Sequence, residues 1–258
     1  KEKSLLDVLS TGIRFAPTII AGVDDAKKVM RTPDRFFDFE AYKQADMIIK
    51  SALKLVSDAY APSVLTLSTF ESGTRAEEST QRAAEVTRNS DINPFVDLYE
   101  DVLLPSEQWD DYGLAGISIV GISQILPGLT LARMLKEKHP HLHVTLGGPI
   151  FSVNSKQLLD QPEFFDEFCD SVVTFEGEEP LHRLLTTLKQ GSALKEVPNL
   201  LFCENGKVEL NEERVELRFE ELPPPTFDGL PMDLYLSPYP ILPVLQSRGC
   251  YWGKCTFC

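Results

Sequence analysis

Three cysteines near the carboxyl end are the residues in this sequence that are best suited to chemistry. Cys250, Cys255 and Cys258 have the spacing C-x4-C-x2-C. Thiolates spaced in this way can converge on one inorganic centre, and Gly249 and Gly253 let the loop backbone wrap closely around it. A cubane iron–sulfur cluster normally takes four cysteines, so three would leave one iron open to chelation by an amine and a carboxylate.

A zinc site is the alternative for the same loop. Structural zinc sites are closed and four-coordinate, so the fold would have to bring His182 over as the fourth ligand. The other two cysteines, Cys169 and Cys203, stand alone in apolar segments and are interpreted as small buried hydrophobic side chains. An odd total of five cysteines without an export signal argues against disulfides and favours a cytoplasmic location.

The composition narrows the class of protein. The 258 residues are enough to bury a substantial core, and 43% of them are hydrophobic. Lys plus Arg number 25 against 39 Asp plus Glu, which gives a net charge of −14. Such an acidic chain without a local basic patch repels nucleic acid and anionic lipid surfaces. No apolar run reaches the ~20 residues that cross a bilayer, so we expect neither a nucleic-acid nor a membrane partner.

The elements that must position a site are clearest between residues 114 and 190. There, apolar runs alternate with amphipathic segments, which predicts an α/β fold with a parallel, flavodoxin-like or Rossmann-like sheet. The run at 114–123 is almost continuously apolar, as in a strand that is buried on both faces. The expected elements are helices within 1–60, strands at 63–69, 114–123, 143–146 and 171–175, and helices at 129–139, 155–169 and 180–190.

A hairpin and a linker follow the last of these helices. Asn205-Gly206 separates the segments 199–204 and 207–211, which is a strong signal for a type I′ turn. The segment 223–243 is rich in proline, which is typical of an extended, semi-rigid linker.

The cysteine loop, SRGCYWGKCTFC, resembles the cluster motif of radical S-adenosylmethionine (radical SAM) enzymes. That motif is usually C-x3-C-x2-C with an aromatic residue before the last cysteine, a position that Phe257 takes here. The longer first gap resembles a variant from one branch of the superfamily, in which a cobalamin-binding domain precedes the radical SAM barrel. Segments GISIVGISQ (116–124), VTLGGP (144–149) and DSVVTFEGEEPL (170–181) are similar to strand ends of those cobalamin-binding domains.

The resemblance implies a function and a domain order. Residues 1–195 would be a cobalamin-binding-like domain with a helical N-terminal part, 196–243 a hairpin and connector, and 244–258 the start of the radical SAM domain. Cys250, Cys255 and Cys258 would hold a [4Fe–4S] cluster whose open iron chelates S-adenosylmethionine. Cleavage to a 5′-deoxyadenosyl radical would then serve a methyltransferase or a related modifying enzyme. Stretches within 41–95 are similar to radical SAM proteins of peptide maturation, which implies a peptide substrate.

A barrel needs roughly two hundred further residues. We therefore expect it to follow Cys258 in a longer chain, and these 258 residues alone to be inactive. The rival reading is a non-catalytic flavodoxin-like binding module with a degenerate cofactor pocket.

Ligands of open parallel sheets bind outside the carboxyl ends of the strands. The small-molecule cofactor would therefore contact Ser118, Ser123, Gln124, Gly147, Gly148, Pro149, Glu176, Gly177 and Glu178. Glycine at such positions also serves plain turn chemistry, and carboxylates also favour a helix N-terminus. The histidine motif D-x-H-x-x-G is absent, so cobalamin would bind without a protein histidine on cobalt. His139, His141 and His143 are interpreted as a solvated cationic patch.

Overall fold

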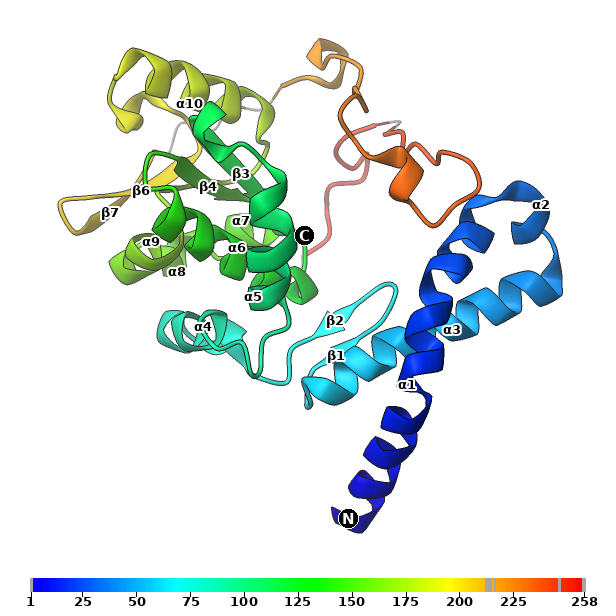
Figure 1. Cartoon of the computed structure of the whole chain (residues 1–258). Coiled ribbons are helices and arrows are strands. Elements are labelled where there is room, and N and C mark those ends of the chain that lie inside the picture. The colour runs from blue at the N-terminus through cyan, green and yellow to red at the C-terminus, as the bar shows by residue number, and fades with distance from the viewer. Residues whose placement is uncertain (1, 212–214, 216, 246, 257–258) are drawn as a thin grey trace. The chain divides into compact units, whose positions relative to one another are not determined.

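The computed structural model describes residues 2–211, 215, 217–245 and 247–256 (Figure 1). The chain divides into two compact units. One consists of Leu53–Glu216 and contains the main sheet, and the other combines Lys1–Ala52 with Leu217–Cys258.

A five-stranded mixed sheet forms the centre of the Leu53–Glu216 unit. The strand order is β3-β4-β5-β6-β7, with the first three strands parallel and the last two antiparallel (Figure 1). The predicted Rossmann-like α/β fold is therefore confirmed. The strands are β3 (Leu114–Ser118), β4 (His143–Gly147), β5 (Ser171–Val173), β6 (Leu200–Glu204) and β7 (Lys207–Leu210).

Helices cover both faces of this sheet. Helices α6 (Ile125–Lys138) and α9 (Pro162–Phe168) pack on one face, and α10 (Glu178–Gln190) packs on the other. Alternation along the strands divides the side chains between the two layers. Val144 and Leu146 face α6 and α9, whereas Val173 faces α10. Burial of these apolar faces is the main stabilising contribution to the unit.

The predicted hairpin is confirmed, and it belongs to the same sheet. Asn205 and Gly206 have φ values of 53° and 75°, the positive pair that a type I′ turn requires. Strand β6 pairs with β5, and β7 then ends the sheet. The helix before the hairpin also ends as predicted, at Gly191 in the left-handed conformation.

The prediction of a doubly buried strand over 114–123 was wrong. Strand β3 stops at Ser118, and it lies at the edge of the sheet within the described residues. Its Gly116 and Ser118 are exposed on the α10 side. The apolar run continues because Ile119 turns into the core after the strand has ended.

The predicted helix at 155–169 is broken into two. Helix α8 (Ser155–Leu158) ends, and α9 begins at Pro162. Gln161 has φ −130° and ψ 64°, because a residue before proline is disfavoured in the helical region. Proline at the first position then suits the start of the next helix.

Short elements lead into the sheet. The predicted strand at 63–69 is instead a small hairpin, because Thr66 Oγ1 accepts hydrogen bonds from the backbone N–H groups of Ser68 and Thr69 and turns the chain. The remaining elements of this region are β1 (Val64–Leu65), β2 (Phe70–Glu71), α4 (Thr80–Thr87), α5 (Phe95–Leu98) and, between β4 and α8, α7 (Pro149–Val153).

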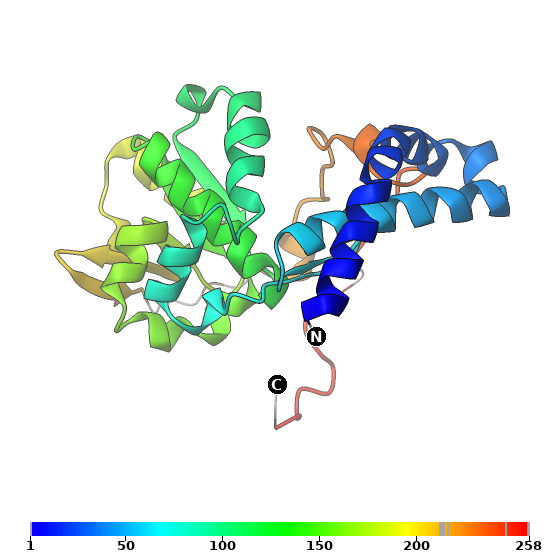
Figure 2. The same ribbon diagram turned by 60° about the horizontal axis from the view of Figure 1, so that its bottom comes forward.

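The other unit is helical. Helix α1 (Glu2–Arg31) packs against the first part of α3 (Phe39–Ala59), with α2 (Pro33–Phe36) between them in sequence (Figure 2). Close approach is possible because Gly22 has no side chain where it meets Ile48. Further along the chain, the guanidinium of Arg31 donates to the Leu234 carbonyl oxygen at 2.6 Å. Within the described residues, no helix is long and apolar enough to cross a membrane.

We predict that Gly148→Ala destabilises the protein by about 2 kcal/mol or more. Gly148 has φ +114°, and an added Cβ would lie 2.3 Å from the carbonyl oxygen of Ile119. Gly116→Ala is the matched control, because its Cβ would meet Thr145 Cγ2 at an ordinary 3.8 Å. Urea unfolding followed by circular dichroism measures both. Equal stability of the two variants would contradict the prediction.

Candidate functional site

A cavity of about 430 Å³ lies at the carboxyl ends of β3, β4 and β5, on the face that α10 covers. Three parallel strands bring their ends to this edge, which is the place where open α/β sheets bind ligands. Its volume is within the roughly 300–1,000 Å³ typical of small-molecule sites.

The floor of this cavity is open because three of its residues have no side chain. Added Cβ atoms at Gly116, Gly147 and Gly177 would meet their nearest neighbours at 3.8, 3.6 and 3.9 Å. These are ordinary contact distances, so the packing of the protein does not itself demand glycine there. The effect of the three glycines is to leave room above the strand ends.

Five of the predicted cofactor residues line this one cavity, although they come from three separate sequence segments. They are Ser118, Gly147, Gly148, Gly177 and Glu178. The turn after each parallel strand supplies one group, and Gly177 and Glu178 also form the start of α10.

Ser123, Gln124, Pro149 and Glu176 are not in the described lining of the cavity. Gln124 has a local role, since its Oε1 accepts a hydrogen bond from the Val120 N–H at 2.7 Å. Pro149 opens α7. Gly148 lines the cavity, but a side chain at this position would clash with the backbone of Ile119. The turn itself therefore requires glycine here, whether or not a ligand binds.

Sequence reasoning missed several residues of the lining. Thr145 is two positions before Gly147 and pairs with Gly116, and Val173 pairs with Gly147. Both residues therefore share the face of the sheet on which the floor glycines lie. The period of two along a strand is the signal that could have found them. Phe175 and Leu181 complete the apolar part of the lining. Phe175 has φ 59°, and its N–H donates to Ser152 Oγ at 2.7 Å.

The cysteine loop belongs to the other unit. Cys250 is exposed and Cys255 is partly exposed, with Gly249 and Gly253 at φ 80° and 54°. The Gly253 N–H donates to Cys250 Sγ at 3.5 Å. Hydrogen bonds from the backbone N–H groups, Gly253 first and then that of the residue before it, lower the pKa of Cys250. Cys258 and Phe257 lie outside the described residues.

A lowered pKa favours the thiolate, which is the form that binds metals. Cys169 is the opposite case, because complete burial raises its pKa well above the usual value. It packs in the core among Phe168 and Val172, as predicted. Cys203 is half-buried against the same core. Of the described cysteines, Cys250 combines exposure with a lowered pKa, the properties that suit a metal ligand.

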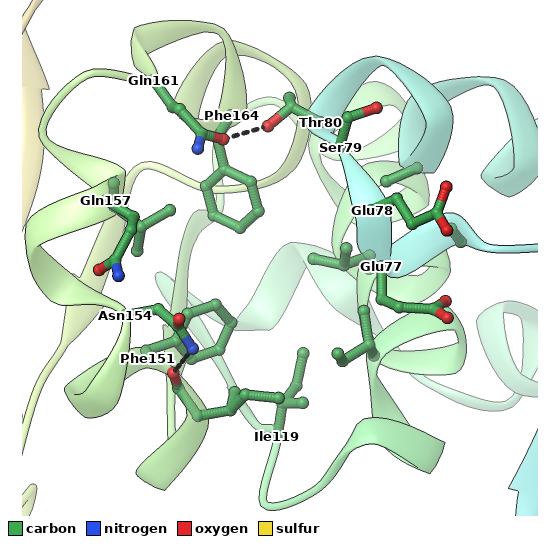
Figure 3. A pocket seen from close by; sticks show the side chains of 16 residues that line it. Glu77, Glu78, Ser79, Thr80, Ile119, Phe151, Asn154, Gln157, Gln161 and Phe164 are labelled. Carbon is green, nitrogen blue, oxygen red and sulfur yellow. Dashed lines mark hydrogen bonds between the residues drawn. The ribbon is translucent and has the colours of Figure 1, made fainter.

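A second cavity of about 240 Å³ lies on the α6 and α9 face (Figure 3). Ile119, Phe151 and Phe164 form much of its apolar wall. Its polar rim is held by a hydrogen bond of 2.7 Å from Thr80 Oγ1 to Gln161 Oε1. The side chain of Ile119 lines this second cavity. Its backbone lies against Gly148, which lines the first cavity.

Comparison with known proteins gives one informative result. No model of a known protein family matches the chain. The chain is similar to an uncharacterised methyltransferase of Pyrococcus horikoshii, with 34% identity over 149 residues. The match covers 54% of this chain and 31% of that relative, so the chain spans only about a third of the relative's length.

We predict that iodoacetamide alkylates Cys250 with a pH midpoint below that of the same residue in concentrated urea. The folded loop donates backbone N–H groups to the sulfur and so keeps it deprotonated at lower pH, whereas the unfolded chain does not. Mass spectrometry of the Cys250 peptide after short labelling pulses measures the midpoint. Cys169 should stay unlabelled in the folded protein because it is buried. Identical Cys250 midpoints with and without urea would contradict the prediction.

Proposed function

We propose that this chain is the cofactor-binding part of a radical SAM methyltransferase, with a corrinoid site on the sheet and a [4Fe–4S] site on the cysteine loop. Methyl transfer is supported by the similarity to the Pyrococcus methyltransferase. The choice of cofactors is supported by the two sites described above. A peptide is the proposed substrate class, on the resemblance of the sequence within 41–95 to peptide-maturation proteins.

The observation that carries the proposal is the convergence of three strand-end segments on one cavity. Ser118, Gly147 and Gly177 are far apart in sequence and meet at the same edge of the sheet. Convergence of small residues where a parallel sheet binds ligands is what a bulky planar cofactor requires.

The residues of this cavity fit part of a corrinoid. A volume of about 430 Å³ accommodates a substituent or nucleotide tail of cobalamin, with the bulk of the ligand outside. Ser118 supplies a hydroxyl group, and Glu178 supplies a carboxylate that accepts from amide N–H groups. The sequence has no D-x-H-x-x-G motif, so the proposed cobalamin has no histidine of this motif on cobalt.

The cysteine loop fits an iron–sulfur cluster by the chemistry of its donors. Cys250 and Cys255 are accessible to solvent, and N–H donation to the Cys250 sulfur favours its thiolate. When bound, the cluster would supply the electron that cleaves S-adenosylmethionine, and the corrinoid would carry the methyl group. The cysteine sulfur atoms would bind the iron, and Gly249 and Gly253, which have positive φ values, would let the loop curve around the cluster.

We predict that the purified chain retains hydroxocobalamin and that Ser118→Leu weakens this binding about tenfold or more. The leucine side chain would fill a cavity whose floor is otherwise bare. Ser123→Leu is the matched control, because Ser123 does not line the described cavity. Corrin absorbance retained after gel filtration, with titration of the quenching of intrinsic fluorescence, measures both. Absence of binding to the unmodified chain would favour a non-catalytic binding module and contradict the corrinoid proposal.

We predict that anaerobic reconstitution with iron and sulfide gives a brown protein with about four irons per chain. Cys255→Ser should lose most of this iron, because the cluster would lose one of three ligands. Cys203→Ser, at a residue that packs against the core of the Leu53–Glu216 unit, should not. Elemental analysis and electron paramagnetic resonance of the reduced protein give the result. One zinc per chain without iron would contradict the cluster and support the zinc alternative.

A further inference from the structure

We propose that Asp110, His139 and His141 form a binding site for a divalent transition metal ion, Zn²⁺ in the first instance. The site lies within the Leu53–Glu216 unit and shares no residue with the cavity at the strand ends. It goes beyond the proposed function, since neither the corrinoid nor the iron–sulfur cluster uses these side chains.

Within the described part of the chain, Asp110, His139 and His141 are close enough together to bind one metal ion. One ligand atom from each lies within 4.8 Å of the others. The His141 ring and the Asp110 carboxylate already approach each other, with 4.0 Å between Nε2 and Oδ1. Ligand bonds to zinc of about 2.0–2.2 Å put ligand atoms roughly 3–4 Å apart, so closure requires a movement of about 1 Å.

The side chains are placed to make that movement. The Asp110 side chain is 95% exposed, so it can rotate without loss of packing. The imidazoles are held more firmly. His139 caps α6, with its N–H donating to the Leu135 carbonyl oxygen, and its ring lies 5.7 Å from the Trp109 ring.

Trp109 acts as the support for both histidines. Its Nε1–H donates to the Leu104 carbonyl oxygen at 2.8 Å, and its side chain packs against the core. Its carbonyl oxygen accepts from His141 Nε2 at 3.2 Å. A backbone carbonyl on one ring nitrogen fixes the ring and its tautomer, as metal-binding histidines commonly show, and it leaves Nδ1 of His141 as the nitrogen that would bind the ion.

Chemistry favours a borderline transition metal over calcium or magnesium. Two imidazoles and one carboxylate suit Zn²⁺, Ni²⁺, Cu²⁺ or Fe²⁺, whereas calcium and magnesium take oxygen ligands. Three protein ligands leave at least one position for water. A bound ion would join the turn at Trp109–Asp111 to the segment between α6 and β4, which are distant in sequence.

The test uses the full chain with the competing cysteine site removed. The background carries Cys250→Ser, Cys255→Ser and Cys258→Ser, together with Trp252→Phe. Because the sequence has two tryptophans, Trp109 is then the sole indole. We expect one Zn²⁺ per chain by isothermal titration calorimetry. We also expect quenching of Trp109 fluorescence by Cu²⁺, since His139 lies against the indole.

In this background, His141→Gln and Asp110→Asn should each weaken Zn²⁺ binding about tenfold or more and reduce Cu²⁺ quenching. His182→Gln and Asp111→Asn are the matched controls, since neither residue belongs to the cluster, and both should bind as the background does. Circular dichroism before metal addition verifies folding. Absence of Zn²⁺ binding by the background, or equal binding by all four variants, would overturn the proposal whether or not cobalamin or iron binds.

Discussion

The structure depends on the close contact between the ends of β3 and β4. The Ile119 N–H donates to the Gly147 carbonyl oxygen at 2.8 Å, and Gly148 then passes so close to Ile119 that no Cβ fits between them. On its other side, Ile119 packs where Gly128 of α6 has no side chain, since a Cβ there would lie 2.6 Å from Ile119 Cδ1. Two missing side chains thus let one isoleucine fix the helix, the edge strand and the turn together. Gly147 and Gly148, which make these contacts, also line the 430 Å³ cavity.

The glycines of this region therefore have two different physical roles. Gly128 and Gly148 are required by packing or by backbone conformation, and the fold needs them even without a ligand. Gly116, Gly147 and Gly177 are under no such requirement, since each has room for a methyl group. Glycine costs conformational entropy wherever it occurs in a strand or turn. Glycines that the packing does not need are consequently the better support for a ligand, and they are the ones on the cavity floor.

Local signals in the sequence predicted the parts of the fold that depend on local chemistry. Asn205-Gly206 specified its turn, and Gly191 ended α10 as expected, because both effects arise within a few residues. The apolar run after Leu114 could not show that β3 is an edge strand, since edge position depends on what pairs beside it. The location of the cavity was predictable to the level of strand ends, since five of the nine predicted contact residues line it. Gln124 lies outside the described lining, and its side-chain oxygen accepts a hydrogen bond from a neighbouring backbone N–H, which the residue type does not reveal.

His139, His141 and His143 occupy alternate positions in the sequence, and their different burial gives them different chemical properties. His143 does not belong to the solvated cationic patch that was predicted for the three. His143 lies within β4, where its Nε2 is 2.8 Å from Ser171 Oγ, which donates in turn to Thr145 Oγ1. Burial lowers its pKa, and nearby Lys136 lowers it further against the opposing effect of Asp170, so near neutral pH the ring is an uncharged hydrogen-bonding group. His139 and His141 precede the strand, remain accessible, and meet an aspartate from a turn almost thirty residues earlier. The same residue type thus completes a buried polar chain at one position and offers metal ligands at the other two.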